Sequence, residues 1–217
     1  SFFANTDRGN AQIASFYPGA MAQSVSVTLT DLPYTPDLVM ISPDDPEAMR
    51  QRVYECQHMK IPYIYDPSQQ IVRLGPDQLR EGIAGAHMLI VNDYEFGLIK
   101  DKIDLDVETV TGLGTALAVT KGEQGSTVYV NGSRYTIGIY PTDTARDPTG
   151  QGDAFRGGFL RGMAAGLPWI LCGQIGALAA TYCSEQVGTQ NHKYSLEEFV
   201  SRFREVFDDD GALHVLL

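Results

Sequence analysis

The sequence predicts an α/β fold in which helices flank a doubly wound, mostly parallel β-sheet. Short apolar runs without polar alternation recur along the chain, and such runs are typical of strands buried on both faces of a parallel sheet. A short buried helix would give a similar run. Segments with helical patterns separate the runs, and this alternation is the second observation that favours the α/β class. The four runs span residues 38–41, 61–65, 88–91 and 116–119.

The first elements are a hairpin and a helix. Residues 1–17 contain two stretches with strand character around a polar turn at residues 6–9, and Pro18 ends the pattern. Further along, Asp45 is a typical N-cap residue and Pro46 suits the first helical turn. The helix predicted after them has an apolar stripe formed by Met49, Val53 and Cys56.

The second half of the chain predicts another hairpin and three helices. Asn131-Gly132 is the favoured two-residue turn between the strands of a hairpin. Residues 154–165 are rich in small side chains, and Pro168 begins a longer helix. A capping box at residues 195–198 precedes the last helix. One face of the longer helix is apolar, with Leu171, Ile175, Leu178 and Tyr182. The last helix is predicted to bury the rings of Phe199, Phe203 and Phe207.

Charge and composition exclude several classes of protein. The chain has 27 acidic and 16 basic residues, a formal net charge of −11, and no basic stripe that would follow nucleic-acid phosphates. No apolar run approaches the length of about 18 residues that a membrane span needs, and the first residues do not resemble a signal peptide. Cys56, Cys172 and Cys183 match no disulfide or zinc spacing. We therefore expect a cytoplasmic protein with a small-molecule substrate and without nucleic-acid or membrane partners.

The segment from Asp147 to Gly158 has the pattern of an anion-binding site. Gly150 and Gly152 precede a helix predicted to start near Asp153. Glycine lets the backbone turn sharply and brings N–H groups close to a ligand. The N-terminus of a helix adds exposed N–H donors and a partial positive charge. Together these features predict a site for a phosphate group.

Asp153 has two interpretations. An isolated Asp before a helix is usually a cap. The glycines on both sides of Gln151 favour another role, because capping requires neither of them. A base beside a group of anion-binding N–H donors is what the phosphorylation of a hydroxyl requires. Three other glycine or serine motifs, the Walker loop, the dinucleotide fingerprint and the nucleophile elbow, do not fit the sequence.

Polar residues follow the predicted strands, where ligands collect in open α/β sheets. The four apolar runs end in Ser42, Asp66, Asn92 and Thr120. Asn92 and Glu95 lie three residues apart in a first helical turn, and two interpretations remain open. They form a capping box, or Glu95 acts through water on Mg²⁺. The segment 120–125 is a hairpin turn by itself, and beside a nucleotide it is a loop that meets phosphates.

These motifs resemble a known family. The segment Asp147-Pro-Thr-Gly-Gln-Gly-Asp153 resembles the signature Asp-Thr-x-Gly-Ala-Gly-Asp of the ribokinase-like (PfkB) carbohydrate and nucleoside kinases. Asn92-x-x-Glu95 is similar to their magnesium motif, and Thr120-x-Gly122-x-x-Gly125 to their nucleotide loop. The order and separation of the three motifs also agree with the family.

The resemblance implies an ATP-dependent kinase with a hydroxyl acceptor. In that family the last signature residue, here Asp153, is the general base, and the backbone N–H groups of Gly150, Gln151 and Gly152 form an anion hole. Glu95 would organise Mg²⁺ through water. Some members bind a monovalent cation such as K⁺ near the signature, and Asp147 and Thr149 match part of that site. The residues implied to contact ATP are Asn92, Thr120, Gly122, Gly125 and Gly188.

The sequence says less about the phosphoryl acceptor and about the oligomeric state. Residues 12–21 and 185–190 look most like bacterial adenosine-kinase-like members, which implies a nucleoside acceptor. A free sugar such as ribose or fructose is the alternative, and a regulatory nucleotide-binding protein without turnover is the alternative of another class. We expect residues 1–30 to be part of a β lid, through which a homodimer could form, and residues 31–217 to be the α/β nucleotide-binding and catalytic domain. The acidic and Gly-Gly-Asn segments with which the family holds its acceptor are not found, so we expect an N-terminal portion to be absent.

Overall fold

The computed structural model describes residues 2–6 and 12–217 of the chain. Its main feature is a six-stranded sheet in the order β3-β4-β5-β6-β7-β8. The first four of these strands pair in parallel, and β7 and β8 extend the sheet in antiparallel pairs. The prediction of a mostly parallel sheet is therefore confirmed. The strands are β3 (Val39–Ile41), β4 (Tyr63–Tyr65), β5 (Met88–Asn92), β6 (Ala116–Thr120), β7 (Ser126–Val130) and β8 (Ser133–Ile137).

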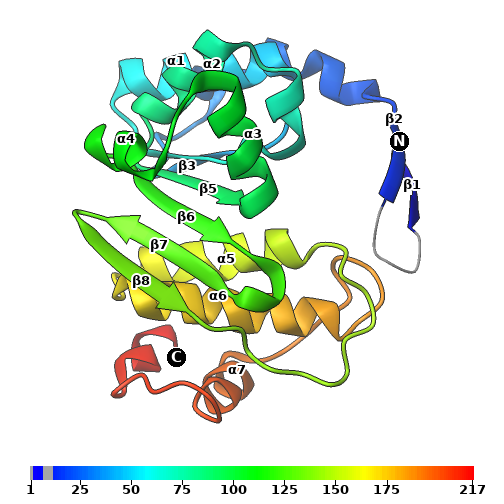
Figure 1. Cartoon of the computed structure of the whole chain (residues 1–217), viewed down its shortest axis with the longest axis vertical. Helices are drawn as coiled ribbons and strands as arrows, with labels where there is room; N and C mark the ends of the chain where they lie inside the picture. The colour runs from blue at the N-terminus through cyan, green and yellow to red at the C-terminus, as the bar shows by residue number, and fades with distance from the viewer. Residues whose placement is uncertain (1, 7–11) are drawn as a thin grey trace.

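Helices cover both faces of this sheet (Figure 1). The helices α1–α4 lie on one face, and α5 and α6 lie on the other. A last helix, α7, packs on the far side of α6. The first four are α1 (Pro46–Met59), α2 (Pro76–Ala84), α3 (Asp93–Ile103) and α4 (Val107–Gly112), and the others are α5 (Gln151–Ala164), α6 (Trp169–Ser184) and α7 (Leu196–Phe203).

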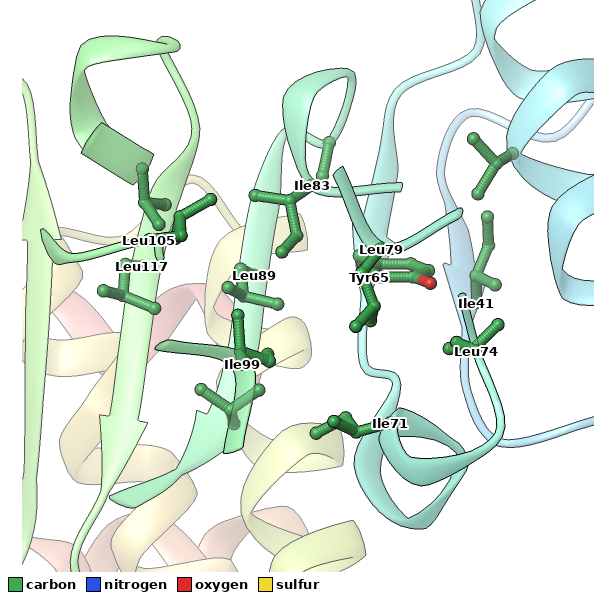
Figure 2. Packing of buried hydrophobic residues seen from close by; sticks show 14 of the residues in the cluster. Ile41, Tyr65, Ile71, Leu74, Leu79, Ile83, Leu89, Ile99, Leu105 and Leu117 are labelled. Carbon is green, nitrogen blue, oxygen red and sulfur yellow. The ribbon is translucent and has the colours of Figure 1, made fainter. Parts of the chain in front are cut away.

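The alternation of side chains along each strand explains the two cores. In β5, Leu89 and Val91 belong to the core under α1–α4, of which Figure 2 shows Leu89 beside Ile99 and Leu117. The intervening Met88 and Ile90 belong to the core under α5 and α6. Since both faces are covered, the positions before the polar last residue of β5 are all apolar, which is why the runs show no polar alternation. None of the described helices is long and apolar enough to cross a membrane.

Most local signals of the sequence act as predicted. Asp45 accepts the N–H of Glu47 at 3.0 Å and caps α1. Asn131 and Gly132 have φ values of 49° and 74°, the left-handed conformation that a two-residue hairpin turn requires. The capping box at residues 195–198 begins α7. One boundary differs, because α5 begins at Gln151 and not near Asp153.

The N-terminal hairpin forms a separate two-stranded sheet of β1 (Phe2–Thr6) and β2 (Gln12–Phe16) (Figure 1). Most of its predicted turn, residues 7–9, lies outside the described residues. Phe3 is the register partner of Ser15, the residue before Phe16. Because successive side chains of a strand point to opposite faces, Phe3 and Phe16 lie on opposite faces of the hairpin.

The chain after the hairpin is fastened to α1. Two 3-10 helices, Gly19–Ser26 and Leu29–Asp31, connect β2 to the main sheet. Ser24 donates its hydroxyl to Asp44 at 2.7 Å, and Arg52 of α1 donates to the carbonyl oxygen of Ser24 at 3.1 Å. These contacts fix the base of the segment from which the hairpin extends.

Candidate active site

The ends of the parallel strands bring the predicted polar residues to one edge of the sheet. Asn92 and Thr120, the last residues of β5 and β6, are register partners. After β3 and β4, Ser42 donates its hydroxyl to Asp66 at 3.3 Å. The members of these two pairs are 28 and 24 positions apart in the chain, and the parallel register brings them together at the ends of neighbouring strands.

A cavity of about 800 Å³ lies next to this edge. Its volume falls within the range of about 300–1,000 Å³ that is usual for small-molecule and cofactor sites. The loop after β6 and the first turn of α5 meet in it, so the predicted nucleotide loop and the signature segment line the same space. Among the lining residues are Thr120, Gly122, Gly125, Tyr140, Asp147, Gln151, Gly152 and Thr181. The other predicted site residues do not line the cavity, and they are Asn92, Glu95, Thr149, Gly150, Asp153 and Gly188.

The N-terminus of α5 presents open backbone donors. Gly150 is its N-cap with φ +88°, a conformation that favours glycine, and no side chain of the described residues caps this end. The N–H groups of Gly150, Gly152 and Asp153 have no hydrogen-bond partner within the part of the chain that the structure describes. The N–H of Gln151, which we expected in the anion hole, donates instead to the carbonyl oxygen of Pro148 at 3.3 Å.

Asp153 is the third residue of α5 and its side chain is 87% exposed. Its carboxylate accepts no backbone N–H among the described residues, so it does not cap the helix. Its Oδ1 lies 3.6 Å from Nη1 of Arg156. The second arm of the same guanidinium, Nη2, donates to Oδ1 of Asp66 at 2.7 Å. Arg156 was not among the site residues predicted from the sequence, although a basic residue three positions after an acidic one on a helix indicates such a pair.

Asp66 is buried at the end of β4, with 2% of its side chain exposed. Burial raises the pKa of its carboxyl to about 6, and the nearby Glu95 acts in the same direction. The guanidinium of Arg156 and the hydroxyl of Ser42 oppose this rise because they stabilise the ionised form. The ion pair therefore has one deeply buried carboxylate whose charge depends on Arg156.

Glu95 forms a capping box with Asn92 at the start of α3. The capping-box interpretation of this motif is therefore confirmed. One Glu95 oxygen accepts the N–H of Asn92 at 2.8 Å and the other accepts the hydroxyl of Ser68 at 2.9 Å. Each carboxylate oxygen retains a further lone pair for a water molecule. No cluster of three or more His, Cys, Asp or Glu side chains that could hold a metal exists among the described residues. The carboxylate of Glu95 therefore fits a cation that keeps most of its water ligands, as Mg²⁺ does. It does not fit a cation that is enclosed by protein ligands.

Asp147 joins the signature segment to the loop after α6. Its Oδ1 accepts the N–H of Thr149 and its Oδ2 accepts the N–H of Gly188, both at 2.9 Å. The hydrogen bond from the Gly188 N–H has the largest effect on the pKa of Asp147 and lowers it, and the contacts with Thr149 lower it further. Gly188 thus contacts the signature segment, and its predicted contact with a nucleotide stays a prediction. The same holds for a monovalent cation at Asp147 and Thr149.

A second ion pair, which the sequence did not indicate, contacts Tyr140 in the lining of the cavity. Both arms of Arg202, on α7, donate to Glu185 at 2.8 and 2.5 Å. Its guanidinium carbon lies 5.0 Å from the ring centroid of Tyr140 and 4.4 Å from that of Tyr182. Since Tyr140 lines the cavity, α7 takes part in shaping it.

Comparison with known proteins gives the family of the chain. Residues 3–195 match the pfkB family of carbohydrate kinases. The chain belongs to this family. A nucleoside kinase from Methanocaldococcus jannaschii is 28% identical over 197 residues, which are 91% of this chain and 64% of that protein. The chain therefore spans just under two thirds of the length of this relative.

Solved structures give the same result. The nucleoside kinase of Burkholderia thailandensis in complex with inosine is 32% identical and has a TM-score of 0.91, with 95% of this chain and 68% of that one covered. A ribokinase from Thermotoga maritima has a TM-score of 0.76 at 21% identity, over 94% of this chain and 69% of that one, and shares the fold. The predicted ribokinase-like architecture is confirmed.

Proposed function

We propose that this chain carries the phosphoryl-transfer site of an ATP-dependent nucleoside kinase. The observation that carries the proposal is the single cavity in which the loop of Gly122 and Gly125 meets the first turn of α5 at Gln151 and Gly152. A nucleotide in this cavity would direct its phosphates toward the N-terminus of α5, where the N–H groups of Gly150 and Gly152 are open and the helix dipole favours anions. Asp153 stands next to that end.

In the proposed reaction Asp153 accepts the proton of the acceptor hydroxyl as its oxygen attacks the γ-phosphorus. The bond from the γ-phosphorus to the bridging oxygen breaks, and ADP leaves. The N–H groups of Gly150 and Gly152 hold the oxygens of the group in transfer, where charge redistributes. Glu95 orders water around Mg²⁺, which when bound offsets the charge of the phosphates.

The relatives favour a nucleoside as acceptor. The M. jannaschii protein is a nucleoside kinase, and the B. thailandensis nucleoside kinase has been solved with inosine and with ADP and inosine. A protein 31% identical over 143 residues, 63% of this chain and 51% of that one, is a cytidine kinase from Thermococcus kodakarensis. Among nucleosides we propose adenosine-like purines, with ribose or fructose as the second candidate.

ADP release by the full-length protein tests the proposal. ATP and Mg²⁺ are supplied with adenosine, inosine, cytidine, ribose or fructose, and kcat/KM is compared across the panel. We expect the highest value for a purine nucleoside. A higher value for a free sugar would contradict the acceptor, and ATP binding without ADP release for any acceptor would favour a regulatory nucleotide-binding protein.

A further inference from the structure

Arg156 lies between a buried and an exposed carboxylate. Nη2 donates to Asp66 at 2.7 Å, and Nη1 lies 3.6 Å from Asp153. Asp66 is almost fully enclosed and is also bonded to Ser42, so it is a fixed anchor at the end of β4. Because the guanidinium is planar and has donors on both arms, Asp66 can fix one arm while the other stays beside Asp153.

The glycine at position 152 leaves space for this arrangement. Gly150 has a positive φ that favours glycine, but Gly152 does not. A Cβ on residue 152 would instead lie 2.8 Å from Nη1 of Arg156, closer than real Cβ contacts allow. The missing side chain at position 152 therefore makes room for the guanidinium, which packs directly on the turn that we propose to hold the phosphoryl group.

We propose that Arg156 is a positioning residue for phosphoryl transfer, which is anchored by Asp66 and holds the carboxylate of Asp153 toward the acceptor hydroxyl. This inference rests on the proposed function of the site. An exposed Asp side chain has several rotamers of similar energy, and a fixed cation on one side selects among them. The positive charge also reduces the repulsion between Asp153 and the phosphates that must approach it.

Kinetics of three single variants test the role. Arg156→Gln removes the charge and should lower kcat about 10- to 100-fold, because misplacing a catalytic group by about 1 Å has effects of that order. The KM for ATP should change less than about threefold, since Arg156 does not contact the cavity. Arg156→Lys keeps the charge but cannot reach both carboxylates, so its kcat should also fall. Arg161→Gln, an exposed arginine further along α5, is the matched control and should match the wild type.

A double variant separates positioning from folding. Arg156→Gln leaves Asp66 buried without its cation, which can destabilise the protein and lower turnover for that reason alone. In Asp66→Asn/Arg156→Gln both partners are neutral and can hydrogen-bond, so the melting temperature should return toward that of the wild type. We expect kcat to stay low in this double variant, and titration with a non-hydrolysable ATP analogue should show unchanged binding.

Three results would overturn the inference. A kcat that returns together with the melting temperature would show that Arg156 acts only on stability, and a kcat of Arg156→Gln equal to that of the wild type would show no role. Either result leaves the proposed function intact, since the wild type still turns over. A folded wild type that releases no ADP with any acceptor would overturn both proposals.

Discussion

Asn92 and Glu95 cap each other at the start of α3. Oδ1 of Asn92 accepts the N–H of Glu95 at 2.7 Å, and a carboxylate oxygen of Glu95 accepts the N–H of Asn92 at 2.8 Å. The cap holds the carboxylate against Asn92, the register partner of Thr120, and Thr120 lines the cavity. A structural contact therefore fixes the group that we propose to act on Mg²⁺ through water.

Glu95→Gln should separate these two roles. Glutamine also closes a capping box, so the free energy of unfolding should change by less than about 1 kcal/mol. The charge that orders the water of Mg²⁺ is lost, so the Mg²⁺ concentration for half-maximal rate should rise by about tenfold or more. Thermal melts and a Mg²⁺ titration measure the two effects. Glu198→Gln in the equivalent box of α7 is the control, and an equal Mg²⁺ requirement in both variants would leave Glu95 with the cap alone.

The sequence was sufficient for features that depend on near neighbours. The Asn131-Gly132 turn, the cap at Asp45 and the glycine at the N-cap of α5 are local signals, because each is decided by the conformation of a few residues. The strand-end residues were also predictable, since buried runs imply a parallel sheet and a parallel sheet brings its carboxyl ends together.

Contacts between distant segments could not be predicted in this way. Arg156 and Asp66 are 90 residues apart, and their pairing depends on how α5 crosses the end of β4. The engagement of the Gln151 N–H by Pro148 depends on the exact path of one turn. The opposite faces of Phe3 and Phe16 follow from a strand register that alternation alone does not fix.

Asp153→Asn tests the proposed base. The amide keeps the size of the side chain but cannot accept the hydroxyl proton, so kcat should fall about 10²–10⁴-fold. ATP affinity should change little, because Asp153 does not line the cavity. Steady-state kinetics of the full-length protein measure both, with Asp143→Asn as an exposed control. Turnover equal to that of the wild type would remove Asp153 from the role of base.

Asp66 should give the folded protein an unusual pH dependence. Its pKa is raised from 3.8 to about 6, so between these values the folded chain binds a proton that the unfolded chain does not. The contribution of this group to stability therefore increases as the pH falls through 6 toward 4. Carboxyls with lowered pKa, such as Glu185, have the opposite effect, so a variant must be compared with the wild type.

Asp66→Asn should remove this contribution. The unfolding free energy of the variant minus that of the wild type should decrease between pH 7 and pH 4, on the order of 2–3 kcal/mol for a shift of about two pKa units. Urea denaturation at four pH values measures it, and Asp77→Asn, with its exposed side chain, is the control. A difference that does not vary with pH would show that Arg156 keeps Asp66 ionised throughout this range.

The two faces of the N-terminal hairpin allow a test of the proposed nucleoside acceptor. Phe16 is 50% exposed, whereas Phe3 and Ile13 on the opposite face are 73% and 81% exposed. Of the two rings Phe16 is the less exposed, and we expect its face of the hairpin to face the acceptor. An aromatic ring there can stack on a purine, a contact of about 0.5–1.5 kcal/mol beyond the area buried, which ribose or fructose cannot make.

Phe16→Ala should therefore raise the KM for adenosine about three- to tenfold, as such an energy implies. The KM for ATP and the KM for ribose should stay the same, because neither depends on stacking at the hairpin. Phe3→Ala removes an equal ring from the other face and should leave all three constants unchanged. Steady-state kinetics of both variants in the full-length protein measure the effect. Equal changes in the two variants, or a change with ribose as large as that with adenosine, would show that the rings stabilise the hairpin or an interface and do not contact the base.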